Sequence, residues 1–331
     1  MIINYIKEKI LGYSLPQEFA CLALEEIRDP LRVAVTIKGA DTFLDVSSTH
    51  LFLGYKPLVI GIPIQEISGS HLFSNADEIC LSFFESEFRP NTTWKGFVSY
   101  DGSLARIILK KKEILKCGDH AMHLFEGVYA KHEFINSFNQ FINKQKEKRR
   151  LDRKVNINLS ENLADQVQTA YSVPRAISIV TLFENQKMNM FPTDLHGQIN
   201  DGFYVGSLRH GGKANDQVER AKIIALSRID FSWCKQAYAL GKNHMQDLKD
   251  FSSFLVSNKR SRSYNIPLPE SVAAYYELER VDSVDIGIHR IHKYKILYRE
   301  KLNDSKTLGH IHRFYAQWRL NNGKSTKFYW R

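Results

Sequence analysis

The sequence predicts a chain made mostly of β-strands and folded as two domains in tandem. Its length of 331 residues exceeds the roughly 250 to 300 residues at which single hydrophobic cores stop growing. Apolar residues make up 43% and charged residues 25% of the chain, so each domain can bury a core of its own. Segments of strand length recur through both halves in a similar order, which is typical of internal repeats.

The first half contains one expected helix ahead of five expected strands. The helix is placed at about residues 15–27. Short apolar or alternating runs place the strands at residues 31–38, 55–63, 76–84, 103–109 and 123–129. Residues 132–150 then change to helical spacing and become strongly basic, so a second helix is expected to close a first domain of residues 1–150.

The second half, residues 151–331, restarts the strand pattern and is taken as the second domain. Helices are expected at about residues 217–226 and near residues 251–256. Strands are expected at residues 174–182, 202–208, 272–278 and 292–298. The aromatic tail at residues 314–318 is expected to lie in a core or an interface.

Three single-residue matches and one longer motif link the two halves. The single matches are Arg32 with Arg175, Thr49 with Thr193 and Gly61 with Gly206, at offsets of 143, 144 and 145. The motif Gly-x-His-x-x-His begins at Gly118 and again at Gly287. Because the matches occur in the same order, they indicate an internal duplication in which the second copy carries insertions.

Charge and composition disfavour several classes of protein. Residues 1–10 mix charged with apolar side chains, and no stretch reaches the roughly 20 apolar residues of a membrane span, so a cytoplasmic chain without a membrane partner is expected. Part of the net charge of +10 lies in residues 144–154, a run typical of a solvated helix end or linker. Aromatic residues do not interleave with that run, which disfavours nucleic acid as a partner.

The cysteines and histidines do not form a metal-binding pattern. The four cysteines lie far apart in the sequence without a CxxC pair, so we expect them to be free thiols. In a strand, the His-x-x-His spacing turns the two imidazoles to opposite faces. His310 and His312 share a strand face but have no third ligand nearby in the sequence. No bound metal is therefore expected.

The segment most informative about function runs from Asn189 to Lys213. Asn189 and Thr193 flank a proline-containing run, Ser207 and Arg209 end the next expected strand, and two glycines precede Lys213. Glycines let the backbone approach an anion, while Arg and Lys supply charge-assisted hydrogen bonds. This arrangement suits a phosphate. The same residues also fit turn formers and solvated loop charges.

These residues resemble the flavin reductase-like, FMN-binding split-barrel family. That family opens with a Pro-Arg strand ending in Val-Thr, which residues 174–181 match, and continues with Asn-x-x-Pro before a Ser or Thr, which residues 189–193 match. Its later Gly-Asp-His hairpin is similar to residues 118–120, whereas the second half keeps only Gly287 and His289. The resemblance implies two tandem Greek-key split β-barrels packed as a pseudo-dimer.

The resemblance also implies a flavin site in the second barrel. By this similarity, the flavin ring and ribityl chain would be lined by Asn189, Met190 and Thr193, the flavin would be contacted by Ser207 and Leu208, and the phosphate would be met by Arg209 and Lys213. One departure is that Asn215 follows Lys213 and Ala214 where the family commonly has a phosphate-holding Thr.

The first barrel is expected to have lost its own flavin site. Asp45 stands opposite Asn189, and residues 62–63 (Ile-Pro) stand opposite Ser207 and Leu208. These changes remove neutral hydrogen-bond donors and add an acid.

The function implied by the resemblance is that of an FMN-binding protein, and most directly of an NAD(P)H-dependent flavin reductase or related flavin oxidoreductase. The cofactor would carry the chemistry, and no triad or paired-carboxylate motif assigns a catalytic residue. Flavin and a nicotinamide nucleotide are the expected partners, and a homodimer stays open. One alternative is a carrier that holds flavin or haem without turning it over, and another is an interaction or nucleic-acid-binding module.

Overall fold

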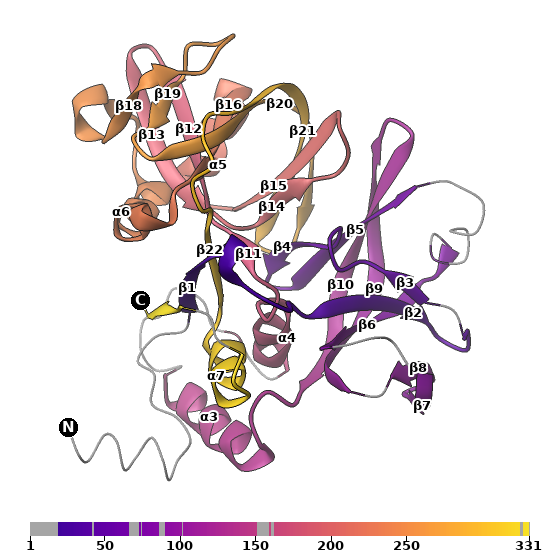
Figure 1. Cartoon of the computed structure of the whole chain (residues 1–331). Coiled ribbons are helices and arrows are strands. Elements are labelled where there is room, and N and C mark those ends of the chain that lie inside the picture. The colour runs from indigo at the N-terminus through magenta and orange to yellow at the C-terminus, as the bar shows by residue number, and fades with distance from the viewer. Residues whose placement is uncertain are drawn as a thin grey trace, which may run out of the picture.

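The computed structural model of the chain contains two large β-sheets, a smaller sheet at their junction, and flanking helices (Figure 1). The structure describes residues 19–41, 43–65, 73, 75–85, 90–100, 102–150, 159, 162–324 and 327–330. Strands account for most of the regular structure in these residues. The predicted mostly β class with flanking helices is confirmed.

The first large sheet has seven antiparallel strands in the order β3-β2-β6-β9-β10-β5-β4. Its central strands are rich in β-branched and aromatic residues, which pack well on a pleated surface. The bounds are β2 Arg32–Ile37, β3 Phe43–Asp45, β4 Leu51–Tyr55, β5 Leu58–Gln65, β6 Glu78–Phe84, β9 Ser103–Cys117 and β10 His120–His132.

The second large sheet has eight strands in the order β14-β15-β21-β20-β16-β12-β13-β17. The bounds are β12 Ser178–Glu184, β13 Lys187–Thr193, β14 His196–Gln198, β15 Phe203–Arg209, β16 Ile223–Ile229, β17 Lys249–Asp250, β20 Val272–Ile286 and β21 His289–Lys301. Read from the other edge and without β17, this order matches the first sheet strand for strand. Equal topology is what a duplication would produce, and the duplication stays a prediction.

A four-stranded sheet joins the ends of the chain at the junction of the two barrels. Its order is β11-β22-β1-β23, so the N-terminal strand β1 pairs with β22 from the C-terminal part. The bounds are β1 Phe19–Ala23, β11 Arg175–Ala176, β22 Leu308–His312 and β23 Tyr329–Trp330. Two hairpins complete the strands: β7 Pro90–Trp94 with β8 Phe97–Tyr100, and β18 Val256–Arg260 with β19 Pro267–Pro269.

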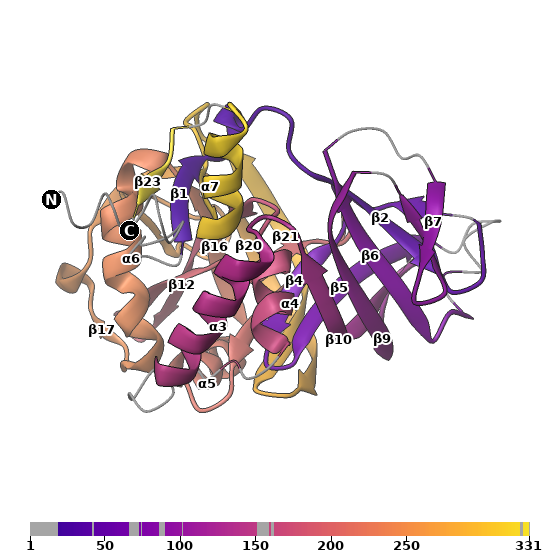
Figure 2. The same ribbon diagram turned by 90° about the horizontal axis from the view of Figure 1, so that it is seen from below.

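The helices lie outside the barrels. Figure 2 shows α3, α4 and α7 together beside the first barrel. The bounds are α3 Ser137–Arg150, α4 Leu163–Ala170, α5 Lys213–Ala221, α6 Cys234–Ala239 and α7 Arg313–Asn321, with 3-10 turns η1 Leu24–Glu26, η2 Phe231–Trp233, η3 Leu240–Met245 and η4 Phe251–Ser253. No helix in the described ranges is long and apolar enough to cross a membrane.

Equivalent strands of the two barrels face each other across an apolar interface. The buried side chains there are Leu53, Val59, Leu115, Cys117, Met122 and Leu124 from the first barrel, and Ile199, Val205, Ile286 and Ile291 from the second. Hydrogen bonds frame this cluster, including Asn200 Nδ2 to the Cys117 carbonyl at 3.0 Å and Lys293 Nζ to the Lys116 carbonyl at 3.0 Å. The barrels are therefore held by contacts that resemble a protein core.

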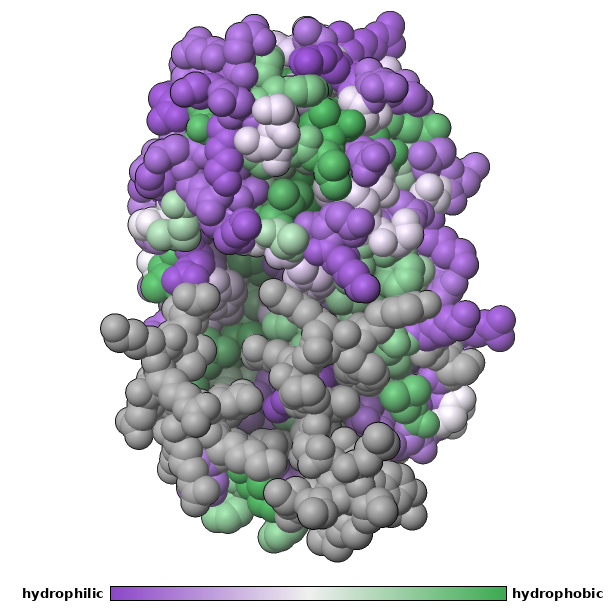
Figure 3. All heavy atoms as spheres, turned by 90° about the vertical axis from the view of Figure 1, so that its left-hand side faces the viewer, coloured by the Kyte–Doolittle hydropathy of each residue, from purple (hydrophilic) through white to green (hydrophobic). Residues whose placement is uncertain are grey.

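The segment between β16 and β20 leaves apolar side chains exposed. Met245 is 61% exposed, and Leu255 is 57% exposed. On the face that carries this segment, Figure 3 shows apolar side chains gathered in the upper half and bordered by hydrophilic ones.

The predicted helix at residues 15–27 is wrong where the structure describes it. Phe19–Ala23 form strand β1, and only Leu24–Glu26 form a 3-10 turn. The reason is tertiary, because β1 has β22 on one edge and β23 on the other. Residues 15–18 lie outside the described residues.

The two helices predicted in the second half were also misplaced. Helix α5 ends at Ala221, because Lys222 adopts a positive φ of 59° and Ile223 already opens β16. Near residues 251–256 the chain forms only η4 before β18 begins at Val256. Apolar spacing alone does not distinguish a short buried strand from a helix.

Candidate functional site

Strand β15 divides the predicted flavin-binding residues between two faces. Tyr204 and Leu208 belong to the core of the second barrel, whereas Val205 packs in the interface with the first barrel. Because side chains alternate along a strand, Ser207 and Arg209 share the face of Val205. The Ser207 hydroxyl is buried, and no described residue hydrogen-bonds to it. Arg209 is exposed at the strand end.

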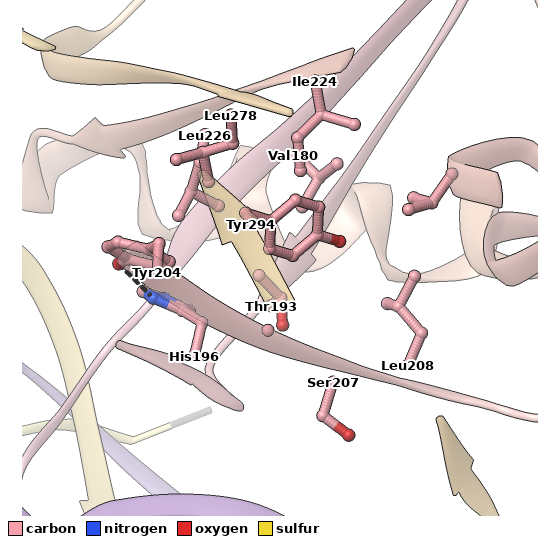
Figure 4. Close-up of a pocket in the computed structure, with 12 residues that line it drawn as sticks. Val180, Thr193, His196, Tyr204, Ser207, Leu208, Ile224, Leu226, Leu278 and Tyr294 are labelled. Carbon is pink, nitrogen blue, oxygen red and sulfur yellow. Dashed lines mark hydrogen bonds between the residues drawn. The ribbon is translucent and has the colours of Figure 1, made fainter. Parts of the chain in front are cut away.

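A cavity inside the second barrel is too small for a flavin. Its volume is about 20 Å³, which is room for about one water. Thr193, Tyr204 and Tyr294 are among the residues that line it (Figure 4). In that view the Ser207 hydroxyl points away from the tyrosines. A flavin would therefore not fit inside the barrel.

Asn189 and Met190 lie in the interior rather than at the surface. The Asn189 amide Nδ2 donates to Gln217 Oε1 at 2.8 Å and to the Asn243 carbonyl at 3.0 Å. Met190 is 0% exposed and packs in a cluster with Trp233. These two residues hold η3 and α5 against strand β13.

The two predicted phosphate-binding cations have different partners. Lys213 is the first residue of α5, and its Nζ lies 2.5 Å from Asp247 Oδ2 in an exposed ion pair. Arg209 lies close to Tyr55 of the first barrel, where its charge partly offsets the effect of burial on the pKa of the Tyr55 hydroxyl. Gly211, with a φ of 73°, makes the turn between them. Both cations border the N-terminus of α5, where backbone N–H groups favour anions.

A buried polar cluster that the sequence reasoning missed lies next to Thr193. Asp194 Oδ2 accepts hydrogen bonds from Tyr171 Oη at 2.6 Å and from His310 Nε2 at 2.8 Å. The Arg175 guanidinium is also buried and donates to the Ala170 carbonyl at 3.3 Å. The shared strand face of His310 and His312 was visible in the sequence, but nothing local connected it to Asp194.

Electrostatics fix the charge state of this cluster. Burial alone raises the pKa of Asp194, but hydrogen bonds from His310 and Tyr171 outweigh it and hold that pKa at about 2. Burial and the Asp194 charge raise the pKa of Tyr171 well above its usual value. Burial lowers the pKa of Arg175 only to about 10. At neutral pH the site therefore holds a carboxylate, a neutral phenol and a cation.

Two aromatic side chains, Tyr55 of the first barrel and His289 of the second, meet between the barrels. The ring of Tyr55 lies edge-on to His289, with centroids 4.4 Å apart. Burial raises the pKa of Tyr55 to about 12 and lowers the pKa of His289 to about 4, so both are neutral at neutral pH. In the first barrel, a Cβ on Gly61 would lie 2.7 Å from Met122 Sδ, so this glycine lets strand β5 pack closely against strand β10. Asp45 there is paired with Arg32 at 2.6 Å.

Comparison with known proteins gives similarity in fold. No protein-family model matches the sequence, and no curated protein sequence matches it. An FMN-binding protein from Thermus thermophilus with bound p-hydroxybenzaldehyde is 16% identical, with a TM-score of 0.34, and the match covers 39% of this chain and 73% of that one. The NADH:FAD oxidoreductase SgcE6 of Streptomyces globisporus C-1027 is 12% identical, with a TM-score of 0.39, over 44% of this chain and 86% of that one.

A third similar structure is BorF, the flavin reductase component of a bacterial two-component tryptophan halogenase. It is 12% identical, with a TM-score of 0.39, over 44% of this chain and 91% of that one. Each of these matches covers less than half of the present chain. The matched proteins are FMN-binding proteins and flavin reductases, which is the kind of protein that the sequence resemblance predicted.

Proposed function

We propose that the chain binds FMN between its barrels and acts as an NAD(P)H-dependent flavin oxidoreductase. The proposed binding region, called the mouth below, comprises Thr193, Ser207, Arg209 and Lys213. The observation that carries this proposal is the face of β15 turned toward the first barrel, where the buried Ser207 hydroxyl lacks a described partner and Arg209 is exposed. A buried hydroxyl costs free energy unless a ligand or water satisfies it. The choice of flavin follows the sequence resemblance of residues 189–193 and 207–213.

The seven residues take different parts in this proposal. Thr193 and Ser207 contact the flavin, and Arg209 and Lys213 hold its phosphate. Behind them, strands β13 and β15 are packed and fixed by Asn189, Met190 and Leu208. An exposed ion pair contributes little stability, so a phosphate dianion can displace Asp247 from Lys213.

The bound flavin would supply the redox chemistry, while the chain supplies position and electrostatics. The competing function is a carrier that holds flavin or haem without turnover. An absorbance spectrum of the purified protein separates flavin from haem, and NADH or NADPH oxidation with added FMN separates an oxidoreductase from a carrier. A colourless protein that ignores FMN would contradict the proposal.

One flavin per chain is expected, because the first barrel has Ile62 and Pro63 opposite Ser207 and Leu208, and an acid, Asp45, opposite Asn189. FMN should also bind more tightly than riboflavin, which lacks the phosphate. Fluorescence titration measures both quantities. Two equivalents at saturation would mean a second site, and equal affinity for riboflavin would remove the phosphate role of Arg209 and Lys213.

A further inference from the structure

A chain of hydrogen bonds crosses the junction of the barrels beside the proposed flavin site. Tyr171 and His310 both bond to Asp194 Oδ2, at 2.6 Å and 2.8 Å. On the other side of the imidazole, His310 Nδ1 lies 3.2 Å from Tyr238 Oη. Tyr238 Oη in turn accepts from Cys21 Sγ at 3.3 Å. These contacts fit an imidazole with its proton on Nε2, donated to Asp194.

Strand register fixes the position of His310. Strand β22 lies between β1 and β11, with His310 opposite Cys21 on one side and Arg175 on the other. Residues directly opposite each other point to the same face of a sheet. The ring of Phe19 also stacks on His310 at 4.9 Å between centroids, with 20° between the planes. The carboxylate of Asp194 is therefore bound to an imidazole that cannot easily move.

The described residues form hydrogen bonds with one oxygen of Asp194. Both contacts are made to Oδ2, and among the described residues none donates a hydrogen bond to Oδ1. The Asp194 side chain keeps 21% of its surface exposed. A carboxylate accepts hydrogen bonds and cannot donate them. Oδ1 is thus an acceptor that the described residues leave open on a partly exposed side chain.

Asp194 lies at the same mouth as the predicted flavin-binding residues. It directly follows Thr193 at the end of β13. Its charge acts on Tyr55 and His244, and the charge of Arg209 acts on the same two residues. The carboxylate and the guanidinium therefore lie near the same pair of side chains.

We propose that Asp194 determines ligand specificity by accepting, at Oδ1, a hydrogen bond from the bound flavin. The donor is the imide N–H of the ring or a hydroxyl of the ribityl chain. This inference rests on the proposed function. It adds a residue that distinguishes ligands with a hydrogen-bond donor from ligands without one. A ligand without that donor would leave the carboxylate unpaired, which a partly buried site penalises strongly. Tyr171 and His310 act as positioning residues that hold the carboxylate in place.

The first barrel lacks this acceptor. The offset that pairs Thr49 with Thr193 places His50 opposite Asp194. The imidazole of His50 is buried, and its Nδ1 bonds to the Val46 carbonyl at 2.7 Å. A neutral imidazole that is hydrogen-bonded to the backbone cannot take the place of a carboxylate oxygen that accepts a hydrogen bond from a ligand. This difference agrees with a single flavin site in the second barrel.

The test compares Asp194→Asn with the wild-type protein in titrations of FMN, N3-methyl-FMN, riboflavin and lumiflavin. N3-methyl-FMN lacks the imide donor, and lumiflavin lacks the ribityl hydroxyls. Asp194→Asn should weaken FMN binding by roughly 10-fold to 150-fold. If the imide is the donor, N3-methylation weakens binding to the wild type but not to the variant. If a ribityl hydroxyl is the donor, the effect of the variant disappears with lumiflavin.

Asp247→Asn is the matched control, because it also removes one negative charge near the mouth but leaves Asp194 intact. It should not lower FMN affinity. A His310→Gln variant keeps the carboxylate but loses the imidazole that orients it. Its affinity for FMN should lie between those of the wild type and Asp194→Asn. It should bind neither N3-methyl-FMN nor lumiflavin more tightly than the wild type does.

Two results would overturn the inference. Wild-type protein that binds FMN, with Asp194→Asn binding every flavin equally well, removes the role of Asp194 and leaves the proposed function standing. Wild-type protein that binds no flavin removes both. Should Asp194→Asn fail to fold, the wild type decides: binding N3-methyl-FMN as tightly as FMN, and lumiflavin as tightly as riboflavin, excludes the hydrogen bond.

Discussion

At the scale of single residues, burial keeps several histidines uncharged. Burial is the largest cause in each case, and it lowers the pKa to about 3 for His50 and to about 4 for His196, His289 and His292. In the unfolded chain an imidazole has a pKa of about 6.5. As the pH falls through 6.5, the unfolded chain therefore binds protons that the folded protein does not bind.

This difference predicts that the protein loses stability in mild acid. The free energy of unfolding should rise between about pH 4 and pH 6.5 and level off above pH 7, with each histidine contributing a slope of about 1.4 kcal/mol per pH unit. Urea unfolding at pH 5, 6 and 7.5 measures the slope. A His50→Gln variant should show a shallower slope than the wild type. Equal stability at pH 5 and pH 7.5 would contradict the neutral buried state.

The cations of the β15–α5 loop give a second prediction at this scale. Arg209→Ala and Lys213→Ala should each weaken FMN binding by roughly 10-fold to 150-fold, because each removes a hydrogen bond to a charged phosphate. Both side chains are exposed, so melting of the apo protein should change little. Isothermal titration with FMN measures the loss.

Asp247→Asn serves as the control, because it releases Lys213 from its ion pair without removing a cation. Its affinity for FMN should be unchanged or higher. If both alanine variants kept wild-type affinity, the phosphate would have to lie elsewhere.

At the scale of elements, the two long hairpins are equivalent in topology but differ in their contacts. The turn of the β9–β10 hairpin contains Gly118, with a φ of 69°, and the turn of the β20–β21 hairpin contains Gly287, with a φ of 60°. A Cβ on Gly118 would meet nothing nearer than Phe203 Cε2 at 3.6 Å. A Cβ on Gly287 would lie 2.1 Å from Pro57 Cδ and 2.3 Å from the Lys56 carbonyl.

These contacts predict different costs for the same substitution. Gly118→Ala carries only the strain of a positive φ, about 1 kcal/mol. Gly287→Ala carries that strain and also forces the hairpin away from the first barrel, which adds roughly 1 to 3 kcal/mol. It should also weaken the hydrogen bond from the Ile288 N–H to the Lys56 carbonyl, now 3.0 Å. Chemical denaturation of both variants tests this, and equal destabilisation would mean that the turn does not press on the first barrel.

At the scale of the whole molecule, the ends of the chain tie the barrels together. Ala20 and Leu22 of β1, Ile311 of β22 and Tyr315 of α7 are all buried in the core of the first barrel. Cys21 of the same strand β1 instead packs in a cluster of the second half. One small sheet therefore contributes side chains to two cores.

This arrangement predicts that the barrels unfold in one cooperative transition. Ile311→Ala, at a position 0% exposed, should destabilise the protein by about 2 to 5 kcal/mol and lower the midpoint for both barrels. Circular dichroism and tryptophan fluorescence should give coincident transitions. Val281→Ala, at a position 46% exposed, is the control and should change little. Two separate transitions, with only one moved by Ile311→Ala, would show that the barrels fold independently.

The sequence by itself determined the mostly β class, and it located strands such as β2, β12 and β15, because alternation and apolar runs are local signals. It also predicted Arg209 and Lys213 as phosphate-binding cations, and this stays a prediction. Tertiary structure alone decided that β1 is a strand, because its partners β22 and β23 lie at the other end of the chain. It likewise decided the pairing of Asp194 with His310, since these residues are 116 positions apart and no local pattern can show which distant side chains will meet in a folded core.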